Sequence, residues 1–185
     1  GGEGPKVIAT RKGVFNNHFT LPMETPKAST AIVYTGDMPY TPENIIRLNA
    51  LGEIFRMEFT GKIREEEGGT YGVQVHQEAE KLPKEGFTLQ FRFDCDPGRR
   101  TALAGVMNGV VSDMQMKGPD TGKLQKVKEY MVKQQSDNLK ENSYVLQNTW
   151  QYYIHSIDLE KDYLKQVNML TESSLQQFAQ QLFGQ

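Results

Sequence analysis

Apolar and polar side chains alternate between residues 87 and 95, and this alternation constrains the fold more than any other feature of the chain. The apolar positions are Phe87, Leu89, Phe91, Phe93 and Cys95, and the polar residues between them are Thr88, Gln90, Arg92 and Asp94. Successive side chains of a strand point to opposite faces. The pattern therefore predicts a half-buried strand with one apolar face and one polar face.

A long amphipathic helix is predicted from Pro42 to about Glu66. Thr41 is a favourable N-cap residue, Pro42 suits the first helical position, and Glu43 places an acid in the first turn. Apolar residues then recur at three- or four-residue steps, at Ile45, Leu48, Leu51, Phe55 and Phe59. This spacing predicts one buried face on a helix about 35 Å long, which Gly68 and Gly69 end.

The remaining patterns predict three further strands and a helical C-terminal part. Strands are indicated by Phe15, Phe19 and Leu21 ahead of Pro22, by residues 29–35, and by Tyr71, Val73 and Val75. A second helix starts at Asp96-Pro97, carries Leu103, Val106, Val110 and Met114 on its apolar face, and stops at Gly118-Pro119. From Thr121 the chain is predicted to be helical, with breaks near 142–143 and 156–158 and a new start at Thr171-Glu172.

These elements predict an α+β fold, a two-layer sandwich in which a mainly antiparallel sheet has helices packed on one face. Residues 1–12 are expected to form an N-terminal arm or linker, and residues 13–185 a single domain. The net charge of −2, with 37% hydrophobic and 24% charged residues, gives no support for binding nucleic acid or an anionic membrane. No apolar run approaches the roughly 20 residues of a membrane span.

Two catalytic chemistries are disfavoured by the residues themselves. The histidines His18, His76 and His155 lie far apart and have no carboxylate at ligand spacing on a shared helix, so no metal site is predicted. Cys95 closes an alternating apolar face, which favours a small buried hydrophobe over a nucleophile.

Arg64 and Tyr71 are candidate site residues, because the junction between helix and strand brings them into one region. Taken alone, they are also consistent with a surface arginine and a half-buried strand tyrosine. Two details favour a site. The glutamates at 65–67 oppose the helix dipole, and the glycines around the junction permit close approach of another main chain.

Several segments together resemble the C-terminal, non-zinc-binding domain of bacterial pitrilysin/insulinase-family zinc metallopeptidases. They are residues 38–44, the helix that follows, the Arg64-Glu65 to Tyr71 element within 63–73, and residues 94–97, 118–128 and 170–172. The resemblance covers roughly residues 13–183. Its most specific part is the Arg-Glu, Gly and Tyr element.

The resemblance implies a peptidase built from two homologous α+β halves that enclose a chamber. The partner half, in cis or in trans, would bind zinc through a His-x-x-Glu-His motif, which this chain lacks. The present half would supply Arg64 and Tyr71 to the peptide substrate. By analogy, Tyr71 would donate to the oxyanion formed during hydrolysis, and Arg64 would hold a neighbouring substrate carbonyl.

The resemblance also implies a final strand after the last helix, so we expect the chain to be an excised or truncated domain that is inactive alone. A purely structural partner domain is the alternative, and an unrelated binding module is a third reading. Relatives of this kind are often exported, so a periplasmic parent protein is one option.

Overall fold

The computed structural model describes residues 13–21, 27–65, 72–140, 146–148 and 162–185. Within these ranges four antiparallel strands form one sheet in the order β1-β2-β4-β3. The strands are β1 (Gly13–Leu21), β2 (Lys27–Asp37), β3 (Val73–Glu80) and β4 (Gly86–Cys95). Strand β4 lies between β2 and β3, although β3 precedes it in the chain.

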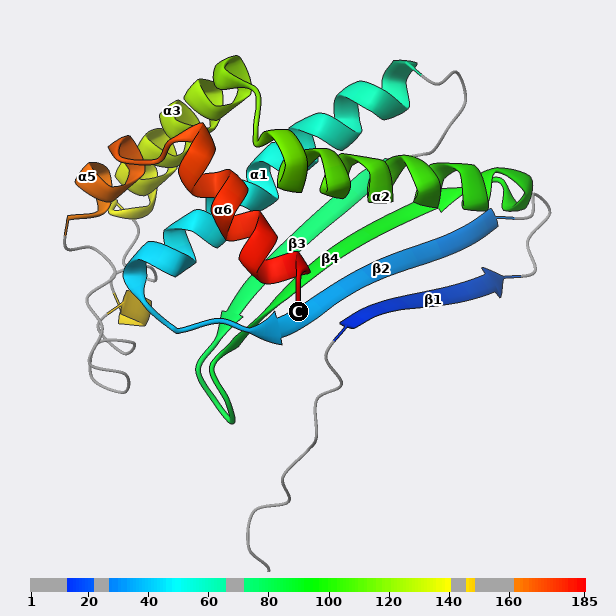
Figure 1. The fold of residues 1–185 in the computed structure, drawn as a ribbon, viewed down its shortest axis with the longest axis horizontal. Helices are drawn as coiled ribbons and strands as arrows, with labels where there is room; N and C mark the ends of the chain where they lie inside the picture. Colours follow the sequence, from blue (N-terminus) through cyan, green and yellow to red (C-terminus); the bar gives the residue numbers. More distant parts are fainter. Residues whose placement is uncertain (1–12, 22–26, 66–71, 141–145, 149–161) are drawn as a thin grey trace, which may run out of the picture.

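The helices form a second layer on one side of the sheet, as Figure 1 shows. They are α1 (Pro42–Glu65), α2 (Arg100–Lys117), α3 (Thr121–Asn138), α5 (Tyr163–Asn168) and α6 (Glu172–Phe183). The predicted α+β two-layer architecture is therefore confirmed. Among the helices that the structure describes, none combines the length and the hydrophobicity that a membrane span requires.

The sheet has one buried face and one face open to solvent. On β4 the five apolar residues of the alternating pattern are buried, whereas Arg92 and Asp94 are exposed. The antiparallel register places Gln74 opposite Arg92 and His76 opposite Gln90. We call this second side the open face; its described residues are Ser29, Ala31, Val33, Thr35, Gln74, His76, Glu78, Glu80, Thr88, Gln90, Arg92 and Asp94.

An aromatic cluster lies between the sheet and α1. The ring of Phe91 makes edge contacts with the rings of Tyr34, Phe55 and Phe59, at centroid distances of 5.7, 5.2 and 4.7 Å. Phe183 of α6 joins the cluster through Tyr34 and Phe55, at 4.9 and 6.0 Å. Edge-to-face rings add to the stabilisation that comes from burial alone, so this cluster fixes α1 and α6 on the sheet.

Polar caps define three helix starts. The Thr41 hydroxyl accepts a hydrogen bond from the Asn44 amide at 3.2 Å, and the Asp120 carboxylate accepts one from the Lys123 amide at 3.0 Å. Thr171 and Ser174 form a reciprocal capping box at the start of α6. Capping satisfies amides that the first turn of a helix leaves unpaired. The predicted helix starts at Thr41 and Thr171 are therefore confirmed, and so is the capping of each start by the threonine hydroxyl.

The helix after β4 differs from the prediction in two respects. The chain turns at Asp96-Pro97 as expected, but the Asp96 side chain makes no capping bond, and a 3₁₀ turn at Pro97–Arg99 leads into α2. Val106 is only half-buried, whereas Met107 and Val111 are buried. The buried stripe is shifted because α2 contacts α6 as well as α1 and β2.

Two further predictions cannot be compared with the structure. The glycine cap at Gly68-Gly69 and the helix breaks near 142–143 and 156–158 lie outside the described residues. Where the structure does describe the first helix, α1 ends at Glu65, next to the predicted end at Glu66.

Candidate functional site

The predicted site residues lie at the connection between α1 and β3. The main chain of Arg64 belongs to the last turn of α1, but the structure does not describe its side chain. Tyr71 falls in residues 66–71, which also lie outside it. Their proximity on one accessible surface, which the sequence predicts, therefore stays a prediction.

The described residues on either side of this connection are anchored to the core. Ile63 and Val73 are both half-buried and pack against the core cluster. Gly72 has a φ angle of 141° and is exposed. A residue with a side chain would be strained in this conformation, so glycine is suited to the point where the chain enters β3.

A hollow of about 370 Å³ lies at the start of β3. It is lined by Gly72, Val73, Gln74, Arg92, Phe93 and Asp94. Asp94 accepts a hydrogen bond from the Ser29 hydroxyl. Arg92 forms no ion pair with another residue of the described ranges. An arginine and a carboxamide beside an open hollow offer several N–H donors, which suit oxygen acceptors.

Arg92 and Gln74 were not singled out by sequence reasoning. Each stands on the polar side of an alternating strand, so their exposure is readable from the sequence. Their adjacency is not, because it depends on the register of β3 with β4, which pairs Gln74 with Arg92. Only the folded hairpin determines that register.

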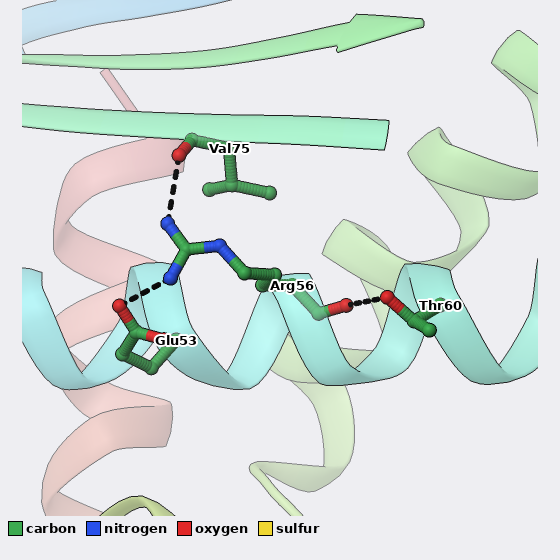
Figure 2. Close-up of polar contacts among 4 residues, drawn as sticks. All are labelled: Glu53, Arg56, Thr60 and Val75. Carbon is green, nitrogen blue, oxygen red and sulfur yellow. Dashed lines mark hydrogen bonds and ion pairs between the residues drawn. The ribbon is translucent and has the colours of Figure 1, made fainter. Parts of the chain in front are cut away.

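A tie between α1 and β3 holds the start of this hairpin (Figure 2). Arg56 Nη2 donates to the main-chain carbonyl of Val75 at 2.9 Å, and Arg56 Nη1 forms an ion pair with Glu53. The Thr60 hydroxyl donates to the Arg56 carbonyl at 2.8 Å. The planar guanidinium donates in two directions at once, so one side chain joins β3 to the helix.

Cys95 is confirmed as a buried residue, with 1% of its surface exposed. Burial raises the pKa of its thiol, and the neighbouring Asp96 raises it further. Both effects disfavour the thiolate, which is the nucleophilic form. The position therefore suits packing and not nucleophilic chemistry.

Metal-ligating residues do not gather in the part of the chain that the structure describes. Groups of three or more His, Cys, Asp or Glu suited to a metal ion are absent there. His76 is exposed, with its Nε2 atom 3.6 Å from a Glu78 oxygen. A zinc site needs about four ligands in tetrahedral arrangement, so this pair alone does not fit the ion.

The family is established by a sequence match. The model of the peptidase M16 inactive domain matches residues 5–131, which is more than half of the chain. The chain therefore belongs to the peptidase M16 inactive-domain family. This match confirms the resemblance to the non-zinc-binding domain of a family of zinc peptidases. No curated protein matches the chain.

Solved structures share the fold at low sequence identity. The periplasmic protease PqqL of Escherichia coli is similar with a TM-score of 0.74 and 16% identity, over 88% of this chain and 18% of that one. The peptidase M16 inactive domain of Pseudomonas fluorescens gives 0.67 and 13%, over 94% and 43%. A domain from Bordetella parapertussis, the inactive peptidase domain of a protein assigned as a zinc protease, gives 0.67 and 13%, over 87% and 88%. The chain thus spans less than a fifth of PqqL, but most of the isolated inactive domain from Bordetella parapertussis.

Proposed function

We propose that this domain is the substrate-binding, non-catalytic half of a zinc metallopeptidase that hydrolyses peptides. Membership of the inactive-domain family carries the proposal. It is supported by the hollow at the start of β3, where Arg92 and Gln74 lie next to the connection that bears Arg64 and Tyr71. The catalytic partner half would be joined in cis or bound in trans.

Arg64 and Tyr71 would have distinct roles toward the peptide. The Tyr71 hydroxyl would donate a hydrogen bond to the scissile carbonyl oxygen as negative charge develops on it. Such a donor is effective because it is fixed before the charge forms. Arg64, which is permanently charged and has several N–H donors, would hold a neighbouring carbonyl already in the ground state.

Zinc would be held by the partner half and would act there as a Lewis acid. The described residues of this chain do not fit the ion, as the absence of a ligand cluster among them indicates. In this proposal the present domain binds and orients the peptide, and the partner half supplies the metal ligands.

The proposal is tested by kinetics on the enzyme assembled from both halves. Tyr71→Phe should lower kcat by roughly 10²–10³ and change KM little, because removing one fixed oxyanion donor affects mainly the transition state. Arg64→Ala should raise KM as well, since its contact exists in the ground state. Tyr130→Phe is the matched control, because Tyr130 is an exposed tyrosine of α3 and should leave both constants unchanged.

A Tyr71→Phe enzyme with nearly wild-type kcat would contradict the proposal and favour the structural partner domain. Thermal unfolding of each variant separates a lost contact from a lost fold. Removing one hydroxyl or one side chain at the α1–β3 connection should leave the unfolding midpoint nearly unchanged.

A further inference from the structure

The charged residues of the open face differ in whether the domain itself supplies a partner for them. Each described acid of this face has a polar contact within the domain: the pairs are Glu78 with His76, Glu80 with Thr88, and Asp94 with Ser29. Arg92 is the only lysine or arginine among the described residues of this face, and it is exposed. Its guanidinium forms no hydrogen bond or ion pair with another described residue. Arg92 therefore offers a permanent positive charge and five N–H donors to a ligand.

The space beside Arg92 is open because the chain enters β3 through a glycine. An added Cβ at Gly72 would meet no described atom within 4 Å, and Gly72 lines the hollow of about 370 Å³ together with Arg92 and Gln74. The register of β3 with β4 places Gln74 directly opposite Arg92. The hollow thus has room for a side chain of a bound peptide next to both residues.

We propose that Arg92 makes the enzyme select peptides that carry an acidic side chain close to the scissile bond. The inference rests on the proposed function, because it takes the peptide to lie beside the connection that bears Arg64 and Tyr71. A carboxylate can accept two parallel N–H bonds from one guanidinium, which no neutral side chain matches in strength. Gln74 can donate a further bond to the same carboxylate from its carboxamide.

Chain connectivity limits how far the acidic residue is from the scissile bond. Gly72 directly follows Tyr71 in the sequence, and Gln74 comes three residues after Tyr71. Since each residue spans at most about 3.3–3.6 Å, no more than about 10 Å of chain separates Tyr71 from the position opposite Arg92. An extended peptide covers this distance in about three residues. The acidic side chain is therefore expected within about four residues of the scissile bond.

Asp94 also lines the hollow and would repel an acidic side chain. Its carboxylate accepts the hydroxyl of Ser29, which belongs to β2, on the opposite side of β4 from β3. Gly72 and Gln74 line the hollow from the β3 side, so a peptide side chain that enters there meets Gln74 and Arg92. Because the contact is open to solvent and one acid lies nearby, the expected selectivity is a few-fold and not several orders of magnitude.

The test compares kcat/KM for a set of fluorogenic peptides on the enzyme assembled from both halves. A neutral parent peptide is given Glu, Gln or Lys at each of the four positions on either side of the scissile bond, one position at a time. At one of these positions Glu should be preferred to Gln by about 3- to 10-fold, and Lys should be the poorest of the three. Raising the salt concentration should reduce the preference, because the contact is between exposed charges.

Two variants assign the preference to Arg92. Arg92→Gln should abolish the Glu-over-Gln ratio, and Arg92→Glu should reverse the order so that Lys is preferred. Lys126→Glu is the matched control, because it makes the same change of charge at an exposed position of α3 and should keep the wild-type ratio. The control separates a local contact from the field of the whole molecule. If Arg92→Glu fails to fold, the ratio in Arg92→Gln decides.

Tyr71→Phe, measured on the same peptides, separates this inference from the proposed function. If Tyr71→Phe lowers kcat but the wild type shows no preference for Glu, or the Arg92 variants retain one, the inference is overturned and the proposed function stands. A wild-type preference for Lys would also overturn the inference, because Asp94 would then dominate the hollow. A nearly wild-type kcat in Tyr71→Phe would contradict the proposed function, and the inference with it.

Discussion

Phe91 stands at the centre of the aromatic cluster, where it is fully buried and contacts three other rings. Phe91→Ala should lower the free energy of unfolding by about 3–5 kcal/mol, because it removes buried apolar surface and leaves a cavity that rigid neighbours cannot fill. Urea unfolding measures the change. Leu82→Ala is the control, since Leu82 is 72% exposed, and should stay within about 0.5 kcal/mol of the wild type. A loss below about 1 kcal/mol for Phe91→Ala would show that the cluster is not packed as described.

Asp113 illustrates a residue whose ionisation is set by neighbours on the surface. A hydrogen bond from Lys117 Nζ, at 2.9 Å, lowers the pKa of the Asp113 carboxyl, and the charges of Lys117 and Lys62 add to this effect. A carboxyl with a lowered pKa in the folded state contributes stability above its ordinary pKa of about 3.9 and loses it as the pH falls through the folded value.

Lys117→Met should therefore raise the pKa of Asp113 toward its ordinary value. The carboxyl-carbon chemical shift of Asp113, followed by NMR between about pH 2 and 6, measures this. Lys126→Met serves as the control, because Lys126 is an exposed lysine of α3 and is not one of the two lysines that lower the pKa of Asp113. An unchanged Asp113 titration in the Lys117 variant would contradict the assigned cause.

At the scale of elements, α1 carries two glycines with opposite surroundings. An added Cβ at Gly61 would meet no described atom within 4 Å, whereas one at Gly52 would stand 2.5 to 3.1 Å from three atoms of the Gln77 side chain. Gly61→Ala should raise the free energy of unfolding by about 0.5–1 kcal/mol, because alanine loses less backbone freedom in a helix.

Gly52→Ala should lack this gain, since the methyl group would displace Gln77 from the face of α1. Denaturant midpoints of the two variants, measured side by side, test the difference. An equal gain for both would show that Gln77 moves aside freely and that the close approach of α1 to β3 is not required.

For individual helices and strands, the local sequence patterns predicted which residues are buried better than they predicted which elements lie next to each other. The alternation in β4 and the caps at Thr41 and Thr171 were readable because they depend on neighbouring residues. The shifted stripe of α2 was not, because its second contact is α6, about sixty residues later in the chain, as the bond from Gln176 to the Met116 carbonyl illustrates.

At the scale of the whole molecule, we expect the chain alone to bind no stoichiometric zinc and to cleave no peptide. The sequence has no His-x-x-Glu-His motif, and the described residues hold no metal-ligand cluster. Elemental analysis of the purified chain, with a fluorogenic peptide assay, measures both. About one tightly bound zinc per chain together with chelator-sensitive proteolysis would contradict the assignment to the non-catalytic half.

The candidate site was predictable only as a region. Arg64 and Tyr71 could be selected from the sequence because a helix, a glycine break and a strand follow one another there. Whether their side chains converge depends on residues 66–71, so that part stays a prediction. The positions of Arg92 and Arg56 in the fold depend on strand register and helix packing, which local periodicity does not encode.

The sequence by itself determined the two-layer class, the buried face of β4 and the family, because periodicity and motifs are properties of neighbouring residues. It determined most of the buried face of α1, but the predicted Ile45 is only half-buried, whereas Ile46 and Ile54 are buried. Tertiary structure alone decided which distant groups meet. The Gln185 carboxamide accepts from the Asp37 amide at 2.7 Å and donates to the Asp37 carbonyl at 2.8 Å, which joins the end of α6 to the end of β2. A cavity lined by Asn49, Gln77 and Gln135 likewise combines α1, β3 and α3. Such long-range contacts result from the packing free energy of the whole core, which no single segment of the chain determines.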